Sequence, residues 1–422
     1  MSQKPTQTAH PKNQLETTNQ FPKISFTEMF WVFFKLGLTS FGGPIAHIGY
    51  FHKLFVEQKK WFTAEEYAEI VSLCQFLPGP TSSQVGMSIG LKCGGISNAF
   101  AAWLGFTIPS MLIMIAAGYG ILTFDGTSLT TILHVLKLLA AAVILQAVLS
   151  MAKTLTPDWT RRILALTATI ILVVNPTALM QLFVLGAGII AGIFLSGNKS
   201  AEIQKTESKS KTYSYASFIQ KLGPVSAIIF GILLFALPLL AIAYTSPIIE
   251  IANIFFQSGA LVFGGGHVVL PLLQSQLVPN GLISHTDFMA GYGMAQAIPG
   301  PLFTFAAYLG VMMHTGLPAW ISGIVCLIII FLPAILLVLA VIPFWDSIRG
   351  NSYIQAGLYG INAVVVGLLL AALINPILIL SLKSGFDIII ILGLFLLLVF
   401  SRLPVWLVIL GASLAGYAWS FI

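Results

Sequence analysis

Four short stretches decide the fold: FGGP at residues 41–44, PGPTSSQ at 78–84, FGGG at 263–266 and PGPLFT at 299–304. The last two repeat the first two, in the same order, in the second half of the chain. The similarity continues outside these stretches, because Gln75 and Gln296 each stand three residues before a Pro-Gly-Pro. The sequence therefore contains an internal repeat that spans most of its length.

Each Pro-Gly-Pro lies in an apolar run. Proline removes a helical hydrogen bond and disfavours a helical conformation in the residue before it, so each run must break at this point. In a membrane, a broken helix is tolerated only where its backbone is buried in protein or lines a cavity. A pair of broken segments at matching positions of two halves indicates the binding site of a transporter.

The composition is that of a membrane protein. Of the 422 residues, 57% are hydrophobic and only 8% are charged, and the mean hydropathy is +0.93. Soluble domains carry about 25% charged residues. The net charge of +6 gathers in the N-terminal tail and in residues 199–221. This clustering is typical of segments that fix orientation at a membrane surface, so we expect contact with a lipid bilayer and none with nucleic acid.

The three cysteines, Cys74, Cys93 and Cys326, are scattered through apolar segments. Their spacing fits neither a zinc site nor a disulfide framework. Paired catalytic carboxylates are absent from the apolar segments as well. We therefore expect no metal, no cofactor and no enzymatic activity.

The sequence predicts four parts: a polar cytoplasmic tail at 1–24, a membrane repeat at 25–195, a cytoplasmic linker at 196–222, and a second repeat at 223–422. The second repeat begins with one extra apolar helix at 225–243. This single helix reverses the side from which the second copy enters the membrane. We expect an all-α polytopic membrane protein whose two homologous halves form an inverted-topology repeat with re-entrant or broken helices.

The basic residues support this orientation. Residues 53–60 contain three lysines, whereas their counterpart in the second repeat, residues 275–286, contains no Lys or Arg. By the positive-inside rule, residues 53–60 and 196–221 face the cytoplasm and residues 275–286 face outside.

Residues 81–84 have the composition of an anion-binding turn. A proline at the first helical position leaves the following backbone N–H groups free, and three hydroxyls and an amide surround them. Helix N-termini bind anions well because they offer unpaired donors and a partial positive charge. The alternative is a simple kink whose hydroxyls bond back to the preceding turn. The second copy is less polar, so we expect the two halves to contribute unequally.

The candidate oxyanion-binding residues lie at the breaks and beside them. They are Lys35, Gly42, Gly43, Gln75, Gly79, Thr81, Ser82, Ser83, Gln84, Gly264, Gly265, Gln296, Gly300 and Thr304.

Four of the candidate residues are ionisable. Lys35 lies in an apolar segment, where a charged side chain is energetically unfavourable and usually has a function. It could draw an anion toward the breaks or extend to the interface as an anchor. His47 and His267 each follow a Gly-rich break, and either could carry a coupling proton or be a packed neutral histidine. Glu57 is a weaker candidate for the same coupling role.

Two acidic residues at matching positions have a simpler explanation. Glu66 follows Thr63, and Asp287 follows Ser284, at the spacing of a capping box. We expect both pairs to begin helices and not to relay protons.

The motifs together resemble the chromate ion transporter family in its long, two-domain form. The resemblance covers nearly the whole chain after residue 24. It rests on residues 41–44 with His47, on Val56, Glu57, Trp61 and Gln75, on residues 78–80 and 263–266, on Pro271 and on residues 299–301.

The resemblance implies a multi-pass carrier in the bacterial inner membrane that exports chromate, driven by the proton gradient or by exchange with sulfate. Chromate and sulfate are tetrahedral dianions of similar size, and the residues alone do not choose between them. Uptake of sulfate or another anion is an alternative within transport, and a membrane-embedded enzyme is an alternative of another class. The sequence leaves the oligomeric state open, and a homodimer is one option.

Overall fold

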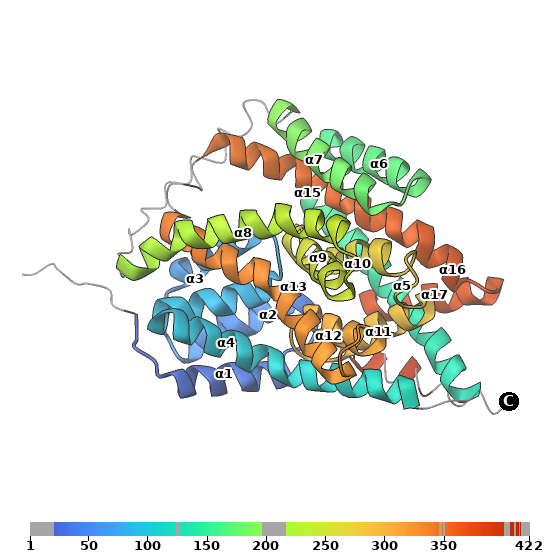
Figure 1. Cartoon of the computed structure of the whole chain (residues 1–422), viewed down its shortest axis with the longest axis horizontal. Coiled ribbons are helices and arrows are strands. Elements are labelled where there is room, and N and C mark those ends of the chain that lie inside the picture. The colour runs from blue at the N-terminus through green and yellow to red at the C-terminus, as the bar shows by residue number, and fades with distance from the viewer. Residues whose placement is uncertain are drawn as a thin grey trace, which may run out of the picture.

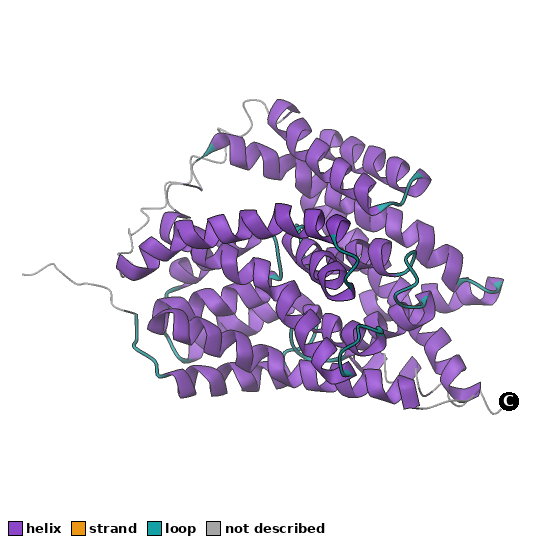
Figure 2. Cartoon of the chain, viewed as in Figure 1, coloured by secondary structure: helices purple, strands orange, loops and turns teal. Residues whose placement is uncertain are grey.

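The computed structural model describes residues 21–123, 127–195, 217–345, 348, 351–400, 406–408, 411–412 and 414. Within these ranges the regular secondary structure is helical and includes no strand (Figure 2). Six of the described helices are long and apolar enough to cross a membrane. The expectation of an all-α polytopic membrane protein is confirmed. The tail at 1–20 and most of the linker, 196–216, lie outside the described residues.

The first repeat contains two broken segments followed by longer helices (Figure 1). Its fourth helix bends at Gly94 and Gly95, where the backbone leaves helical dihedral angles. The elements are α1 (Phe26–Thr39), α2 (Gly43–His52), the π-helical segment η1 (Lys53–Gln58), α3 (Ala64–Phe76), α4 (Thr81–Thr123), α5 (Thr127–Leu155), α6 (Trp159–Val174) and α7 (Ala178–Leu195).

The second repeat follows the same order after one extra helix, α8 (Ser217–Ala243). This helix begins inside the range expected for the linker. The remaining elements are α9 (Pro247–Ala260), η4 (Gly266–Val268), α10 (Val269–Leu277), α11 (His285–Ala297), η5 (Leu302–Thr304), α12 (Phe305–Met312), α13 (Ala319–Val341), η6 (Ile342–Phe344), α15 (Ser352–Ala372), η7 (Leu373–Leu378), α16 (Ile379–Ser381) and α17 (Gly385–Phe400). In both repeats the chain breaks at the Gly-rich stretch and again at the Pro-Gly-Pro, as predicted.

The matching acidic residues begin matching helices. Thr63 Oγ1 accepts a hydrogen bond from the backbone N–H of Glu66, and the Glu66 carboxylate accepts one from the N–H of Thr63. Ser284 likewise accepts from the N–H of Asp287 and donates to its carboxylate. The predicted capping role of these residues is confirmed.

Residues without bulky side chains allow the helices to pack closely. The α6–α7 hairpin lies along α15 at one edge of the molecule (Figure 1). A Cβ atom at Gly192 of α7 would overlap the backbone of α15 at Ala356 and Gly360, and one at Gly188 would lie 2.7 Å from Val364. Such contacts between small residues replace the hydrophobic effect as the main cause of helix association in lipid.

Helices α5 and α15 occupy equivalent positions in the two repeats. The register that pairs Phe106 with Phe331 makes His134 of α5 the counterpart of Tyr359 of α15. Each residue bonds to the start of the helix that follows the other span. The Tyr359 hydroxyl donates to Asp158 after α5, and His134 Nε2 donates to Asp387 after α16, over 3.0 and 2.9 Å.

These two contacts give the relative direction of the repeats. The C-terminal end of each helix lies against the N-terminal part of its counterpart, so the two equivalent spans run in opposite directions. Both belong to segments that can cross a membrane, residues 133–155 and 352–381. The second repeat is therefore inverted with respect to the first, as the sequence predicted.

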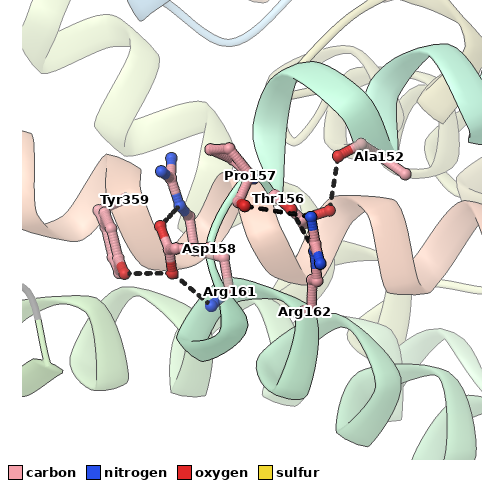
Figure 3. Close-up of polar contacts among 7 residues, drawn as sticks. All are labelled: Ala152, Thr156, Pro157, Asp158, Arg161, Arg162 and Tyr359. Atoms are coloured by element: carbon pink, nitrogen blue, oxygen red, sulfur yellow. Dashed lines mark hydrogen bonds and ion pairs between the residues drawn. The ribbon is translucent and has the colours of Figure 1, made fainter.

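Figure 3 shows one of the two contacts in detail. Asp158 accepts hydrogen bonds from the backbone N–H of Arg161, from the Arg161 guanidinium at 2.7 Å and from the Tyr359 hydroxyl. Burial acts to raise the pKa of Asp158, but these hydrogen bonds outweigh it and hold the pKa below its ordinary value. The ionised carboxylate thus joins α6 to α15.

We expect Asp158→Asn to lower the Tm of the detergent-solubilised protein by roughly 2–4 °C at pH 7, the change typical of about 1 kcal/mol. The carboxylate stabilises the fold fully above its unfolded pKa of about 3.9 and loses this effect as the pH falls through the lower folded pKa. The Tm difference should therefore shrink below about pH 4. Glu250→Gln, at an exposed carboxylate that forms no ion pair with the described residues, should leave Tm unchanged. A difference for Asp158→Asn that stays constant to pH 3 would contradict this assignment.

Candidate functional site

Backbone hydrogen bonds connect the breaks of one repeat to those of the other. The N–H of Gly79 donates to the carbonyl of Val262 over 2.7 Å, and the N–H of Gly300 donates to the carbonyl of Ser40 over 2.9 Å. Val262 and Ser40 directly precede the two Gly-rich stretches. Each Pro-Gly-Pro therefore bonds the Gly-rich break of the opposite repeat, which is the reciprocal arrangement that a two-fold axis generates.

Glycine is required at both donors. Gly79 and Gly300 have φ angles of +125° and +102°, which side chains of L residues rarely tolerate. The space is also filled, because a Cβ at Gly79 would lie 2.9 Å from Gln84 Nε2 and one at Gly300 would lie 2.7 Å from Ser110 Oγ. We call the two places where these hydrogen bonds join the repeats the crossings. The glycines at the two donors therefore fix the crossings in position.

A cavity of about 190 Å³ lies where the two Gly-rich breaks meet. The breaks form two of its walls, and α5 and the end of α11 complete it. Its lining residues are Gly42, Pro44, Ile45, Val143, Gln146, Ala147, Ser150, Met151, Gly264, Gly265, Gly266, His267 and Gln296. Five of these, Gly42, Gly264, Gly265, His267 and Gln296, are candidates that the sequence identified.

Two helices begin at this cavity, one from each repeat. Gly42 caps the N-terminus of α2, and Gly266 begins the continuous helical segment formed by η4 and α10. A helix N-terminus carries unpaired N–H groups and about half a positive charge. Among the lining residues just named, the imidazole of His267 is the one ionisable side chain. The cavity thus offers partial positive charge and neutral polar groups, which suits an anion.

A polar group from the second repeat faces the same space. His267 Nδ1 and the Tyr292 hydroxyl form a hydrogen bond of 2.8 Å, and the same hydroxyl interacts with Gln296. The Gln296 Nε2 atom is buried and has no hydrogen-bond partner in the described part of the chain. A buried donor without a partner is unfavourable. An oxyanion in the cavity would supply the missing acceptor.

The predicted turn at residues 81–84 is buried at the start of α4 but does not line this cavity. Gln84 Nε2 donates to the carbonyl of Pro78 over 2.8 Å, whereas Gln84 Oε1 and Ser83 Oγ have no partner among the described residues. In the second copy, the Thr304 hydroxyl donates to the carbonyl of Pro301 over 2.8 Å. That bond is the local one expected of a simple kink. Binding of substrate by Thr81, Ser82 and Ser83 stays a prediction.

His47 supports the crossing of the two repeats. Its Nε2 atom donates to the carbonyl of Ser40 over 3.1 Å, the same oxygen that accepts from Gly300. The ring is buried and packs edge-on against Phe106. The geometry therefore gives His47 a role in positioning the break, while His267 is the histidine at the cavity.

The other candidates lie away from the cavity. Lys35 is exposed on α1, Gln75 is exposed on α3, and Glu57 is exposed on η1 beside His52, with 3.2 Å between carboxylate and imidazole. Gly43 is the first residue of α2 and directly follows the lining residue Gly42. Gln75 and Gln296 thus occupy matching positions in the sequence but very different environments.

The sequence analysis missed three polar residues of this site. Tyr292 lies one helical turn before Gln296, and Gln146 and Ser150 of α5 are also four residues apart. Polar residues at this spacing share one face of a helix. A search for such pairs in the apolar segments would have found the wall formed by α5.

No group of three or more His, Cys, Asp or Glu side chains that could hold a metal ion occurs among the described residues. Cys74, Cys93 and Cys326 are buried free thiols.

Comparison with known proteins agrees with this architecture. The sequence profile of the chromate transporter family matches the chain twice, at residues 27–193 and 249–417. An uncharacterized transporter of Methanocaldococcus jannaschii is 26% identical over 97% of this chain and 98% of its own length. A probable chromate transport protein of Synechococcus elongatus is 28% identical over 84% of this chain and 85% of its own.

A chromate transport protein of Cupriavidus metallidurans is 26% identical over 94% of this chain and 93% of its own length. No solved structure matches the chain. The double match to the family profile coincides with the two inverted repeats, each of which contributes one of the two Gly-rich breaks that meet at the cavity. The chain is a multi-pass membrane protein that belongs to the chromate transporter family.

Proposed function

We propose that the protein is a secondary transporter of tetrahedral oxyanions that exports chromate across the bacterial inner membrane, coupled to the proton gradient or to sulfate exchange. The observation that carries this proposal is the cavity at which two helix N-termini, from two inverted repeats, meet an unpartnered amide donor. Half-helices that direct their N-termini at a central site are a recurrent way to bind anions in transporters.

The cavity can hold a dianion without a fixed counter-ion. Hydrogen bonds to a charged group contribute about 1.5–3 kcal/mol each, so a few neutral donors replace much of a lost hydration shell. Neutral donors also let the ion leave, because no buried ion pair has to be broken. Chromate and sulfate present the same four oxygens to these donors. We therefore propose that they compete for one site.

The inverted repeats supply the means of alternating access. The bonds from Gly79 to Val262 and from Gly300 to Ser40 hold the breaks of the two repeats together at the site. The contact at Asp158 joins α15 to the start of α6, and the contact at Asp387 joins α5 to the start of α17. Rocking of one repeat against the other would open the cavity to one side at a time. His267 is the candidate carrier of a coupled proton.

Flux measurements in proteoliposomes test this proposal. We expect chromate flux that sulfate inhibits competitively. Either an imposed pH gradient or an outward sulfate gradient should drive this flux. His267→Asn should reduce the effect of the pH gradient while chromate–sulfate exchange persists. His314→Asn, at an exposed histidine, is the matched control and should change neither. Sulfate flux that chromate does not inhibit would identify a sulfate permease instead, and no flux of either anion would refute the proposal.

A further inference from the structure

Lys137 is a buried cation that the proposed mechanism does not use. It lies on α5 near the end of the span that contains His134, and only 5% of its surface is exposed. Its ammonium donates to the Thr286 hydroxyl over a long distance of 3.4 Å. Within the described ranges, no carboxylate lies within ion-pair distance of it. A buried charge is strongly unfavourable without a partner of opposite charge.

The nearest acidic residues are occupied elsewhere. Asp387 accepts from His134 Nε2 at 2.9 Å and from the backbone N–H groups of Lys383 and Ser384 at 2.7 and 2.8 Å. Asp287 is engaged with Ser284 at the start of α11. Both carboxylates act on Lys137 only over longer distances. They lower the local positive potential without pairing with the ammonium.

Two further residues, Lys383 and His285, lie near Lys137. Lys383 is exposed. Both Lys383 and His285 are close enough to Lys137 for an electrostatic interaction. The Nε2 atom of His285 is buried and has no partner in the described part of the structure. The Lys137 ammonium thus contacts the Thr286 hydroxyl at the start of α11, next to His285 in the chain, and Lys383, in the turn before α17, lies within electrostatic range of it.

Helix α5 carries Lys137 and also forms one wall of the cavity. Gln146 of α5 lines the cavity and follows Lys137 by nine residues, which places it about 14 Å further along the helix and on its opposite side. The Asp158 turn lies at the opposite end of α5. By the positive-inside rule, the Lys137 end faces outside.

The arrangement is not repeated at the other end. In the register that pairs Phe106 with Phe331, the counterpart of Lys137 in the second repeat is Asn362. The buried positive charge is therefore a property of one end of the transporter and not of the inverted-repeat fold.

We infer that Lys137, with Thr286, Lys383 and His285, forms a second binding site for a tetrahedral oxyanion between the central cavity and the outer surface. The exposed Lys383 attracts the dianion, and the bound dianion supplies the counter-charge that the buried Lys137 lacks. The inference rests on the proposed function, because it takes the transported anion as the ligand.

Sulfate flux in proteoliposomes tests the site. We expect Lys137→Met to raise the apparent KM for sulfate tenfold or more and Lys137→Arg to stay within about threefold of the natural chain, since an ion pair with an oxyanion survives the second change. Lys153→Met removes an exposed lysine from the opposite end of the same helix and should change KM less than twofold. An unchanged KM in a well-folded Lys137→Met variant that still transports would overturn the inference and leave the proposed function intact.

A second measurement does not depend on the folding of a Lys137 variant. The natural cysteines are buried, so Thr286→Cys can be labelled selectively with a thiol reagent in the full-length protein. We expect sulfate, compared with chloride at equal ionic strength, to slow this labelling at least fivefold. Equal rates in the two salts would overturn the inference. A wild-type protein that moves neither chromate nor sulfate would instead refute the proposed function, on which the inference depends.

Discussion

Gly300→Ala is expected to lower the rate of chromate transport about tenfold or more. Gly300 has a φ angle of +102°, and its N–H bonds Ser40 of the other repeat. An alanine would be strained in this backbone conformation, and its Cβ atom would lie 2.7 Å from Ser110 Oγ. Each such distortion costs about 1–3 kcal/mol, and a barrier higher by about 1.4 kcal/mol slows a step tenfold. The measurement is the initial chromate flux at equal amounts of folded protein.

Gly281→Ala is the matched control for this prediction. Gly281 also has a positive φ angle, +70°, but nothing lies within 4 Å of an added Cβ and the residue is distant in sequence from the breaks. The Gly281→Ala variant adds backbone strain but does not displace the bond between Gly300 and Ser40. It therefore separates the effect of strain from the effect of moving the crossing. We expect a small loss of stability and a flux within about twofold of the natural chain. Equal losses of flux in the two variants would show that the crossing has no special role.

Gln296→Leu is expected to raise the apparent KM for chromate by roughly ten- to hundredfold, the effect of losing one hydrogen bond to a charged group. Gln296 lines the cavity, and its buried Nε2 atom has no partner among the described residues. The internal repeat provides the control, because Gln75 occupies the matching position and is exposed. Gln75→Leu should change KM less than twofold. Equal effects would point to a symmetric site that both repeats build alike.

The sequence was sufficient to predict the features that depend on local chemistry. Pro78 and Pro299 cannot continue a helix in either repeat, and Thr63 and Ser284 have the spacing of helix caps. The single helix α8 was enough to predict that the second repeat is inverted. These features follow from the backbone and from short-range hydrogen bonds, so they do not require knowledge of the packing.

The features that depend on packing could not be predicted in the same way. In an apolar helix, hydropathy does not distinguish the face in contact with lipid from the face in contact with protein. The exposure of Lys35 and Gln75 and the burial of Lys137 were therefore not evident. The bonds from Gly79 to Val262 and from Gly300 to Ser40 join residues far apart in the chain, and they follow from the inverted packing of the repeats. That packing places the starts of α2 and η4, rather than that of α4, at the cavity.

The most direct test of the central claim is a structure determined with chromate bound, because chromium scatters strongly enough to mark the anion. We expect the oxyanion between Gly42 and Gly264, near the N-termini of α2 and of the η4–α10 segment and within hydrogen-bond distance of Gln296 Nε2. Chromate bound at Thr81 to Gln84 instead, with the cavity between the Gly-rich breaks empty, would contradict the account.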